Sequence, residues 1–302
     1  MLERPILVTG AAGGIGRAVV ARAHSPAFLG LTHDELDITD AEAVGRVFDR
    51  LRPPVVINAA AFTAVDAAEL DPVPAYRVNS DGAANLARAC ATHRAWLLHL
   101  STDCVFGEGF DGRPHREDEA PAPLNVYGWS KLRGELAIAE MLPSHIILRT
   151  SWVFGSGLPG FVNAVARALL RNSRADVVTG QVGCPTPIDD LARAIQTCVT
   201  RATAGLLEPG IYHFCSTNPV DRDALAGWMA DWLSRRTGRP RGVLVPCDWR
   251  KRDIARRAAN AALDVEKFEH RTGTRAPEWE PAVSQMLEEM VLAAERPARN
   301  MP

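Results

Sequence analysis

The chain has 302 residues, 47% of them hydrophobic and 23% charged, with a formal net charge of -2. This is an ordinary globular composition, and the length suits one large domain or two moderate ones. The near-neutral charge gives no electrostatic footprint for nucleic acid or an anionic membrane, so we expect no partner of either class.

Short apolar runs alternate with helical patterns in the first half of the chain. This alternation predicts an α/β fold with a doubly wound parallel sheet, and the all-apolar strands are typical of a sheet that is buried on both faces. Strands are predicted at 5–8, 28–31, 55–58, 96–100 and 146–149. Helices are predicted from the first glycine-rich segment to Arg22, at 40–51 with Thr39 or Asp40 as its cap, at 73–93 and at 125–141.

The alternation loosens after Arg149. Helices are predicted at 161–171, 189–201, 221–236 and 281–294, and strands at 210–214 and 242–245. These elements indicate a second, smaller α/β region. The basic runs at 234–241 and 249–252 are either solvated surface or a patch for an anionic ligand.

The cysteines and the N-terminal segment indicate in which cellular compartment the protein is expected. The six cysteines include no Cys-x-x-Cys pair and no Cys/His cluster at zinc-ligand spacing, so we expect reduced thiols and no metal site. The segment MLERPILVTG has an acid where a signal peptide needs a basic residue, and no stretch reaches the ~20 apolar residues of a membrane span. We therefore expect a cytoplasmic protein without a membrane partner.

The segment VTGAAGGIGRAVV spaces Gly10, Gly13 and Gly16 three residues apart, after a predicted strand and at the start of a predicted helix. Such glycines permit a tight turn, a close approach of backbone to a pyrophosphate, and close packing of helix on strand. The helix N-terminus adds free N–H groups for the phosphates. This context distinguishes a dinucleotide-binding loop from a merely glycine-rich turn.

The second predicted strand bears on the choice of cofactor. It ends in Leu31-Thr32-His33-Asp34, with no acid directly at the strand end to hold a ribose 2′-hydroxyl. His33 is available to a 2′-phosphate, with a solvated loop residue as the alternative. We expect NADPH, and NADH stays open because Asp34 and Glu35 are close.

A hydroxyl, a phenol and an amine complete the predicted site. Thr102 and Asp103 follow the fourth strand, at the sheet edge where open α/β sheets bind ligands. Tyr127 and Lys131 lie one helical turn apart in NVYGWSKLRGE, a spacing that is also common on surface helices. With the glycine loop upstream, the trio predicts a ketone reductase: Tyr127 is the general acid, Lys131 lowers its pKa and holds the nicotinamide ribose, and Thr102 orients the carbonyl oxygen.

The glycine spacing resembles that of the extended short-chain dehydrogenase/reductases, and further segments resemble the dTDP-4-dehydrorhamnose reductase family. The resemblance implies a Rossmann domain, a small sugar-nucleotide domain, and reduction of a 4-keto-6-deoxy sugar nucleotide by NAD(P)H, most simply dTDP-4-dehydro-L-rhamnose. The matching segments keep the family's order over about two thirds of the chain: 36–44, 55–69, 76–90, 101–106, 123–135, 148–155, 181–192 and 210–214.

The resemblance also implies domain limits and residue roles. The Rossmann domain is expected at 1–155 plus about 176–202, the substrate domain at about 156–175 and 203–296, and a tail at 297–302. Cofactor contacts are expected from the glycine loop with Gly14 and Ile15, from Asp37 and Ile38 beside the adenine, from Ala59, Ala60 and Ala61, and from Asn79, which braces the loops. Substrate contacts are expected from Thr63, Val65, Asp103, Cys104 and Trp152. For Trp152 the alternative is a purely structural role in the core.

Several positions depart from the family pattern, and they fall where substrate contacts are expected. Cys104 and Phe62 replace tyrosines, Ala67 replaces a lysine, Gly14 a glutamine and Gly160 an asparagine, and Ala258 and Ala261 replace a proline and a serine. The departures leave open a reductase or epimerase of another nucleotide sugar. The alternative from another functional class is a non-catalytic NADP-binding subunit, like the regulatory beta subunit of methionine adenosyltransferase. Whether the protein forms a homodimer is also left open.

Overall fold

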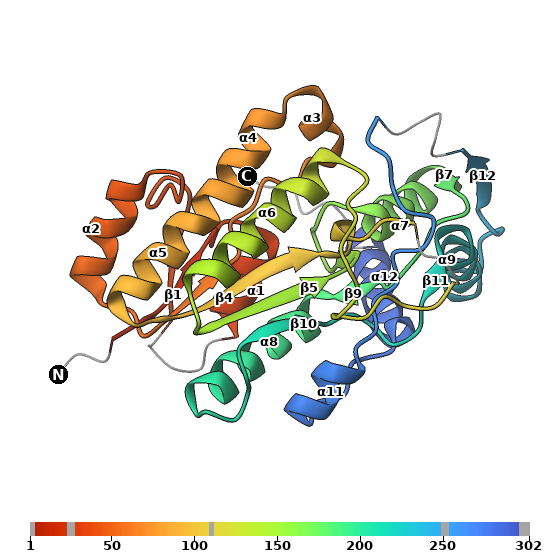
Figure 1. Ribbon diagram of the computed structural model, residues 1–302. Coiled ribbons are helices and arrows are strands. Elements are labelled where there is room, and N and C mark those ends of the chain that lie inside the picture. Colours follow the sequence, from red (N-terminus) through yellow and green to blue (C-terminus); the bar gives the residue numbers. More distant parts are fainter. Residues whose placement is uncertain (1–3, 23–27, 109–111, 249–253, 296–302) are drawn as a thin grey trace.

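The computed structural model describes residues 4–22, 28–108, 112–248 and 254–295 (Figure 1). The predicted tail at 297–302 and the basic run at 249–252 lie outside these residues. Within them, no helix is long and apolar enough to cross a membrane.

A six-stranded sheet forms the centre of the fold, and all of its strand pairs are parallel. The strand order is β10-β5-β4-β3-β1-β2. The strands predicted at 5–8, 28–31, 55–58, 96–100, 146–149 and 210–214 lie in it, which confirms the parallel α/β class, whereas the strand predicted at 242–245 lies outside it. Its strands are β1 (Ile6–Thr9), β2 (Phe28–Leu31), β3 (Val55–Asn58), β4 (Trp96–Thr102), β5 (His145–Thr150) and β10 (Gly210–His213).

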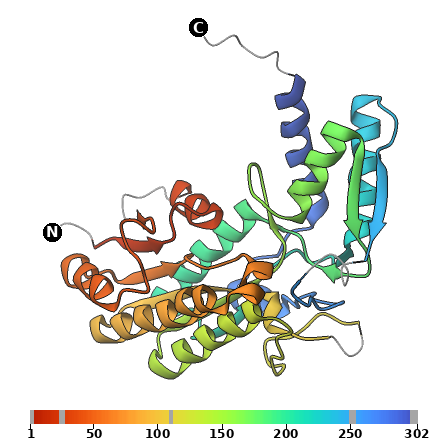
Figure 2. The ribbon, with the colours of Figure 1, turned by 90° about the horizontal axis from the view of Figure 1, so that it is seen from above.

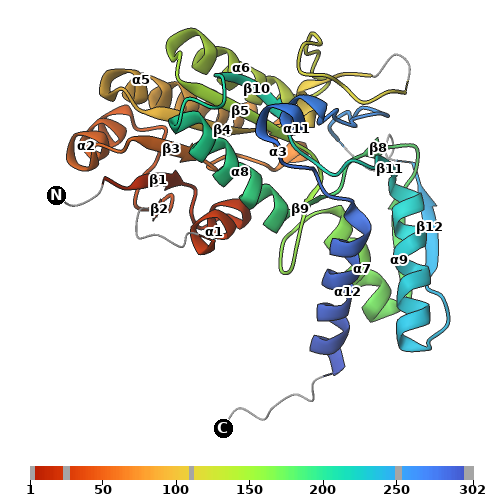
Figure 3. The same ribbon diagram turned by 90° about the horizontal axis from the view of Figure 1, so that it is seen from below.

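Helices cover both faces of this sheet, so the strands are buried on both sides (Figure 3). One core cluster joins the sheet to α1 through Val19 and to α8 through Ile195. The other joins it to α2 through Phe48, to α5 through Leu86 and to α6 through Ile138. The covering helices are α1 (Gly14–Ala21) and α8 (Ile188–Thr203) on the first face, and α2 (Ala41–Leu51), α5 (Ala83–His93) and α6 (Val126–Met141) on the second.

Two of these helices show how local sequence sets their bounds. Asp40 caps α2, since its side chain accepts the N–H groups of Glu42 and Ala43 at 2.9 and 3.0 Å. The helix predicted at 73–93 is a continuous helical run with a change of winding inside it. It comprises α4 (Pro72–Tyr76), the π-helical turn η1 (Arg77–Gly82) and α5. Such π turns are frequent at functional sites, and this one carries the buried Asn79.

A smaller region lies beyond the carboxyl edge of the sheet (Figure 2). Its core packs side chains such as Val165, Leu225, Met229 and Val283 between helices. A two-stranded parallel sheet flanks these helices. The elements are α7 (Phe161–Asn172), β7 (Arg174–Val178), α9 (Arg222–Thr237), β12 (Val243–Cys247) and α12 (Trp279–Glu295).

The structure differs from the expected domain limits at two strands. The expectation placed residues from about 176 onward in the Rossmann domain, whereas β7 pairs with β12 in the smaller region. It also placed residues from 203 in the substrate domain, whereas β10 pairs with β5 as the edge strand of the large sheet. Chain order alone does not reveal which sheet a strand joins, because that depends on its neighbours in space.

Several short elements had no counterpart in the sequence-based prediction. Strands of two residues have no periodicity to detect, and short helices resemble loops. These elements are α3 (Val65–Leu70), the 3₁₀ turn η2 (Asp103–Val105), β6 (Val153–Phe154), β8 (Val182–Gly183), β9 (Thr186–Pro187), β11 (Val220–Asp221) and α11 (Glu266–Thr272).

Candidate active site

The start of α6 is fixed by its neighbours, and this places Tyr127. Asn125 caps the helix by accepting the N–H of Gly128 at 2.8 Å, while Glu69 accepts the N–H of Val126 at 2.7 Å. Gly128 lies directly against the carbonyl oxygen of Cys104, where any Cβ would collide. The first turn of α6 therefore packs against the 3₁₀ turn that directly follows Thr102 at the end of β4.

Two cavities meet at this point. The first, which we call the glycine-loop cavity, has a volume of about 330 Å³ and runs from Gly14 and Ile15 to Tyr127 and Lys131. The second, the distal cavity, has a volume of about 350 Å³ and extends away from the glycine loop. Both are lined by the same six residues where they meet: Thr63, Thr102, Asp103, Tyr127, Trp152 and Val153.

The glycine loop forms a tight turn beside the loop that follows β3. Gly10 has a φ of +67°, a left-handed conformation that favours glycine, and a Cβ there would lie 2.6 Å from the backbone nitrogen of Ala60. The first turn of α1 has no side-chain cap, so its N–H groups stay available at the cavity. Ser101 and Thr150 line the same cavity, and their buried hydroxyls have no hydrogen-bond partner among the residues that the structure describes. Free N–H groups and hydroxyl partners fit the phosphates and riboses of a dinucleotide.

The phenol of Tyr127 is buried, with 9% of the residue exposed. Burial raises its pKa above the usual range, the nearby Cys104 and Asp103 raise it further, and Thr102 opposes them. This runs against the expectation that Lys131 lowers the pKa of Tyr127. The groups that shift this pKa besides burial are Cys104, Asp103 and Thr102 rather than Lys131, one hydrogen of whose amine goes to the carbonyl oxygen of Leu100 at 2.6 Å.

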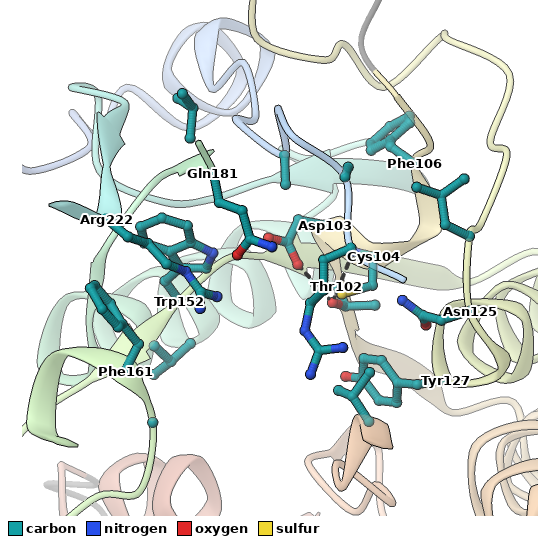
Figure 4. A pocket seen from close by; sticks show the side chains of 18 of the residues that line it. Thr102, Asp103, Cys104, Phe106, Asn125, Tyr127, Trp152, Phe161, Gln181 and Arg222 are labelled. Atoms are coloured by element: carbon teal, nitrogen blue, oxygen red, sulfur yellow. Dashed lines mark hydrogen bonds between the residues drawn. The ribbon is translucent and has the colours of Figure 1, made fainter. Parts of the chain in front are cut away.

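Asp103 lies at the junction of the cavities and is held by hydroxyl groups. Thr102 donates to Oδ1 at 2.9 Å and Ser151 donates to Oδ2 at 2.7 Å. Burial raises the pKa of this carboxyl group, against the opposing effect of those hydrogen bonds and of the Arg222 charge. Figure 4 shows Asp103 beside Thr102 and Cys104.

The wall of the distal cavity in the smaller region is aromatic and cationic. Trp152 has a φ of +37°, which is strained for a non-glycine residue, and it packs directly on Gly183. The guanidinium carbon of Arg222 lies 4.8 Å from the ring centre of Trp152 and 4.9 Å from that of Phe161. Figure 4 shows these three side chains together, across the pocket from Tyr127.

The structure brings most of the predicted site residues to these cavities. All five predicted substrate contacts, Thr63, Val65, Asp103, Cys104 and Trp152, line the distal cavity. Of the predicted cofactor contacts, Gly14, Ile15, Ala59, Ala60, Ala61, Tyr127 and Lys131 line the glycine-loop cavity. Gly10, Gly13, Gly16, His33, Asp37, Ile38 and Asn79 do not line either of the two.

Some residues outside the cavities have clear structural tasks. Asn79 is buried; it accepts the N–H of Phe62 at 2.9 Å and donates to Ser130 Oγ at 2.9 Å, so it ties the loop after β3 to α6. Ile38 is buried in the core between α2 and α5. The pKa of Asp37 is lowered; its burial works the other way and is outweighed by hydrogen bonds from Thr39 and the nearby charge of His33.

Several lining residues of the distal cavity were not among the predicted contacts. Arg222 and Arg257 bring positive charge to it, and the amide nitrogen of the buried Gln181 has no hydrogen-bond partner in the described part of the chain. Arg222 belongs to a predicted helix start with no motif to mark it. The basic run at 234–241 is instead ordinary surface, where Arg236 and Arg241 pair with Glu288 and Asp231. Four departures from the family pattern line the cavity too: Cys104, Gly160, Ala258 and Ala261.

Potential metal ligands are scattered rather than clustered. Among the residues that the structure describes, no three or more His, Cys, Asp or Glu side chains are grouped so that they could hold a metal ion.

A family model and curated relatives place the chain among known proteins. The family described as RmlD substrate binding domain matches residues 4–292. The chain is 34% identical to dTDP-4-dehydrorhamnose reductase of Sinorhizobium fredii (strain NBRC 101917 / NGR234), covering 95% of this chain and 98% of the relative. It is 43% identical to the Streptomyces griseus enzyme of that name, over 73% of each chain.

A solved structure gives the same result in three dimensions. The crystal structure of dTDP-4-dehydrorhamnose reductase from Bacillus anthracis str. Ames in complex with NADP superimposes with a TM-score of 0.85 at 27% identity. The superposition covers 95% of this chain and 100% of that one.

Proposed function

This chain belongs to the dTDP-4-dehydrorhamnose reductase family, and on that premise we propose that it reduces the 4-keto group of a 6-deoxy sugar nucleotide. The preferred substrate is dTDP-4-dehydro-L-rhamnose and the product is dTDP-L-rhamnose. The observation that carries the proposal is the meeting of two cavities at Thr102 and Tyr127. A hydride donor in one cavity and a carbonyl group in the other would meet beside a phenol.

The cofactor in this proposal is NADPH, the donor that matches the NADP of the Bacillus anthracis relative. When bound, it supplies the hydride that reduces the carbonyl carbon. The N–H groups at the start of α1 would hold its phosphates, and the hydroxyls of Ser101 and Thr150, which have no partner among the described residues, would meet its polar groups. His33 is the proposed partner of a 2′-phosphate.

Tyr127 is the proposed general acid. Its Oη holds the proton that the carbonyl oxygen takes up as it becomes a hydroxyl group, and the raised pKa keeps that proton in place until then. Thr102 lies beside it at the same junction and orients the oxygen. Lys131 faces the glycine-loop cavity, where its amine is available to the cofactor's ribose.

The distal cavity takes the nucleotide part of the substrate in this proposal. Arg222 and Arg257 supply the positive charge that a diphosphate needs, and guanidinium groups suit phosphate oxygens well. Trp152 offers an aromatic surface at the junction for the sugar ring.

A second candidate is reduction of a different nucleotide sugar. It is favoured by Cys104, Gly160, Ala258 and Ala261, which bring small or weakly polar side chains to the cavity at positions where the family resemblance implies larger or more polar ones. A substrate with extra apolar substituents would fit such a wall better than one that needs hydrogen bonds there.

The test is to mix the protein with NADPH and 4-keto sugars linked to dTDP, UDP and GDP, and to follow the nicotinamide absorbance. We expect oxidation of NADPH with the dTDP-linked sugar. Faster oxidation with another nucleotide would favour the second candidate. Tight NADP binding without turnover of any keto sugar would overturn both and favour the non-catalytic subunit.

Oligomeric state is a separate proposal. Trp129 and Leu136 are 47% and 60% exposed on α6, and apolar exposure of this kind is common at protein interfaces. We propose a homodimer through α6. Light scattering during size-exclusion chromatography tests it, and a monomer at micromolar concentration would contradict it.

A further inference from the structure

The amide group of Gln181 is buried in the wall of the distal cavity. The residue is 2% exposed and lines that cavity, and its amide nitrogen has no hydrogen-bond partner among the residues that the structure describes. A buried donor without an acceptor costs free energy, and most such donors in folded proteins are satisfied. Because this donor faces a cavity, a bound molecule can supply its acceptor.

The backbone around Gln181 is held on two sides, so the amide is presented from a fixed place. The carbonyl oxygen of Gln181 accepts the N–H of Arg222 at 3.1 Å, which ties it to the start of α9. The N–H of Val182 donates to the carbonyl oxygen of Ala259 at 2.8 Å, and its own carbonyl oxygen accepts the N–H of Ala261 at 2.9 Å. A side chain on such a backbone binds a ligand with little loss of conformational freedom.

The strand β8 places Gln181 beside Trp152. Side chains alternate along an extended segment, so Gln181 and Gly183, which flank Val182, face the same side. That side meets Trp152, whose ring packs directly on Gly183. Figure 4 shows the Gln181 side chain pointing into the pocket, between Arg222 and Asp103.

The order of groups along the cavity matches the order of groups in a sugar nucleotide, and this step rests on the proposed function. With C4 of the sugar at Tyr127 and the diphosphate at Arg222 and Arg257, the ring spans the space between them. C3 and C2 lie between C4 and the anomeric carbon that carries the diphosphate, and each bears a hydroxyl group. Gln181 lies between the same two ends of the cavity, so its amide is placed for these hydroxyls.

We propose that Gln181 is a specificity-determining residue that recognises the neighbouring hydroxyl groups on C2 and C3 of the sugar, with its NH₂ group donating to at least one of them. A hydroxyl oxygen has two lone pairs and accepts such a hydrogen, while the amide oxygen can accept the hydrogen of the adjacent hydroxyl. The ligand is therefore a nucleotide-linked 6-deoxyhexose that keeps both hydroxyl groups, and sugars that lack one of them are selected against.

The structural alternative for the amide is a brace to Asp103, the carboxyl group in the same cavity wall. Both oxygens of Asp103 already accept hydroxyl groups, from Thr102 at 2.9 Å and from Ser151 at 2.7 Å. The described hydrogen bonds include none between Gln181 and Asp103, and the Gln181 amide nitrogen is without a partner in the same set of residues. Recognition of a ligand therefore accounts for the buried amide better than a brace does.

The first test is equilibrium binding, by calorimetry, to the full-length protein loaded with NADPH. dTDP-L-rhamnose is already reduced, so it binds to this form without turnover. We expect its dissociation constant to be about tenfold lower than that of the 2-deoxy or the 3-deoxy analogue, since a buried donor is left without its acceptor by the analogue. Dissociation constants within about twofold of one another for all three ligands would overturn the proposal.

The second test removes the donor and keeps a side chain of similar size. Gln181→Leu should weaken binding of dTDP-L-rhamnose about tenfold, remove the preference over the deoxy analogues, and leave binding of dTDP, which lacks the hexose, within about twofold. The matched control is Gln196→Leu, because Gln196 is half-buried on α8 and lines neither cavity. Folded Gln181→Leu protein that keeps the parental preference would contradict the inference.

The third test observes the amide itself in protein that keeps Gln181, so it decides the question if Gln181→Leu does not fold. The chain contains three glutamines, Gln181, Gln196 and Gln285, so ¹⁵N-labelled glutamine gives three side-chain NH₂ signals. Gln196→Leu and Gln285→Leu identify the other two by their loss. We expect dTDP-L-rhamnose to shift the Gln181 signal more than dTDP does, and an equal response to the two ligands would overturn the proposal.

The outcomes separate this inference from the proposed reaction, because neither the binding constants nor the spectra need hydride transfer. A protein that reduces no keto sugar but shows the Gln181-dependent preference would keep the recognition and lose the reaction. A protein that reduces the keto sugar without that preference would keep the reaction and lose this inference.

Discussion

Oγ1 of Thr102 lies 2.9 Å from Oδ1 of Asp103 and donates its hydrogen to that carboxyl group. The same oxygen accepts the backbone N–H of Cys104 at 3.1 Å. A threonine hydroxyl has one hydrogen, so Thr102 cannot give it to Asp103 and to a carbonyl oxygen at once. The predicted role of Thr102 as the group that orients the carbonyl therefore depends on the charge of Asp103.

Asp103→Asn should change how stability depends on pH. The pKa of Asp103 is raised in the folded protein, so its contribution to the free energy of unfolding is full below the unfolded value of 3.8 and is lost as the pH rises through the folded value. Asparagine does not titrate. The free energy of unfolding of the variant should therefore rise relative to that of the parent as the pH rises, by about 1.4 kcal/mol for each unit by which the pKa of Asp103 is raised.

Urea unfolding between pH 4 and pH 8 measures this difference. The control is Asp118→Asn, because the Asp118 side chain is 79% exposed and far less constrained. A difference between Asp103→Asn and the parent that stays flat with pH would show that Asp103 titrates normally.

Tyr127→Phe should reduce the keto sugar about 10²–10⁴ times more slowly, which is the usual contribution of a general acid. The dissociation constant of NADP should change little, since the ring and its packing are kept. Tyr212→Phe is the matched control, because that buried tyrosine donates its hydroxyl to the carbonyl oxygen of Glu208, away from both cavities. Equal rates for Tyr127→Phe and the parent would remove Tyr127 from the proposed mechanism.

Gly10→Ala should abolish NADP binding or prevent folding. A methyl group there would lie 2.6 Å from the backbone nitrogen of Ala60, and the φ of +67° is unfavourable for alanine. Gly45→Ala provides the contrast: Gly45 lies inside α2, and nothing lies within 4 Å of the position that a methyl group would take there, so the free energy of unfolding should rise by about 0.5–1 kcal/mol. Fluorescence titration with NADPH and urea unfolding measure the two effects, and NADP binding by Gly10→Ala at parental affinity would contradict the close approach.

Arg222→Gln should raise the KM for the sugar nucleotide about tenfold, the equivalent of about 1.4 kcal/mol, because a cation that faces the substrate and stacks on Trp152 is lost. The dissociation constant of NADP should stay within about twofold. Arg174→Gln is the control, since Arg174 lies on the surface beside Asp176. If the dissociation constant of NADP rose while the KM for the sugar nucleotide stayed the same, Arg222 would contact the cofactor and not the substrate.

Sequence reasoning succeeded where a residue type has a local meaning. The apolar runs such as VVIN became buried strands, Asp40 became a helix cap, and the glycine loop adopted its turn because only Gly10 tolerates that conformation beside Ala60. Each of these features is marked by a residue type that stands in the sequence itself, even where its neighbour in space, such as Ala60 beside Gly10, lies far along the chain.

Sequence reasoning failed where two residues in contact come from separate elements of the fold. In the sequence, His99 is a single polar residue within an apolar predicted strand. Its contact with Lys131 depends on which face of β4 meets α6. Both faces of that strand are buried, so the hydropathy pattern does not distinguish them. Arg222 faces Trp152 only because β11 pairs with β8, a pair of two-residue strands with no sequence signal.

The placement of β10 at the edge of the large sheet has a consequence for truncated and nascent chains that lack this strand. All residues of β5 are buried, and β10 covers the side of β5 that faces away from β4. A fragment that stops before residue 210, whether made by truncation or emerging from a ribosome, would present a bare apolar edge on which other chains could add strands. We therefore expect a fragment without β10 to aggregate more readily than the full chain.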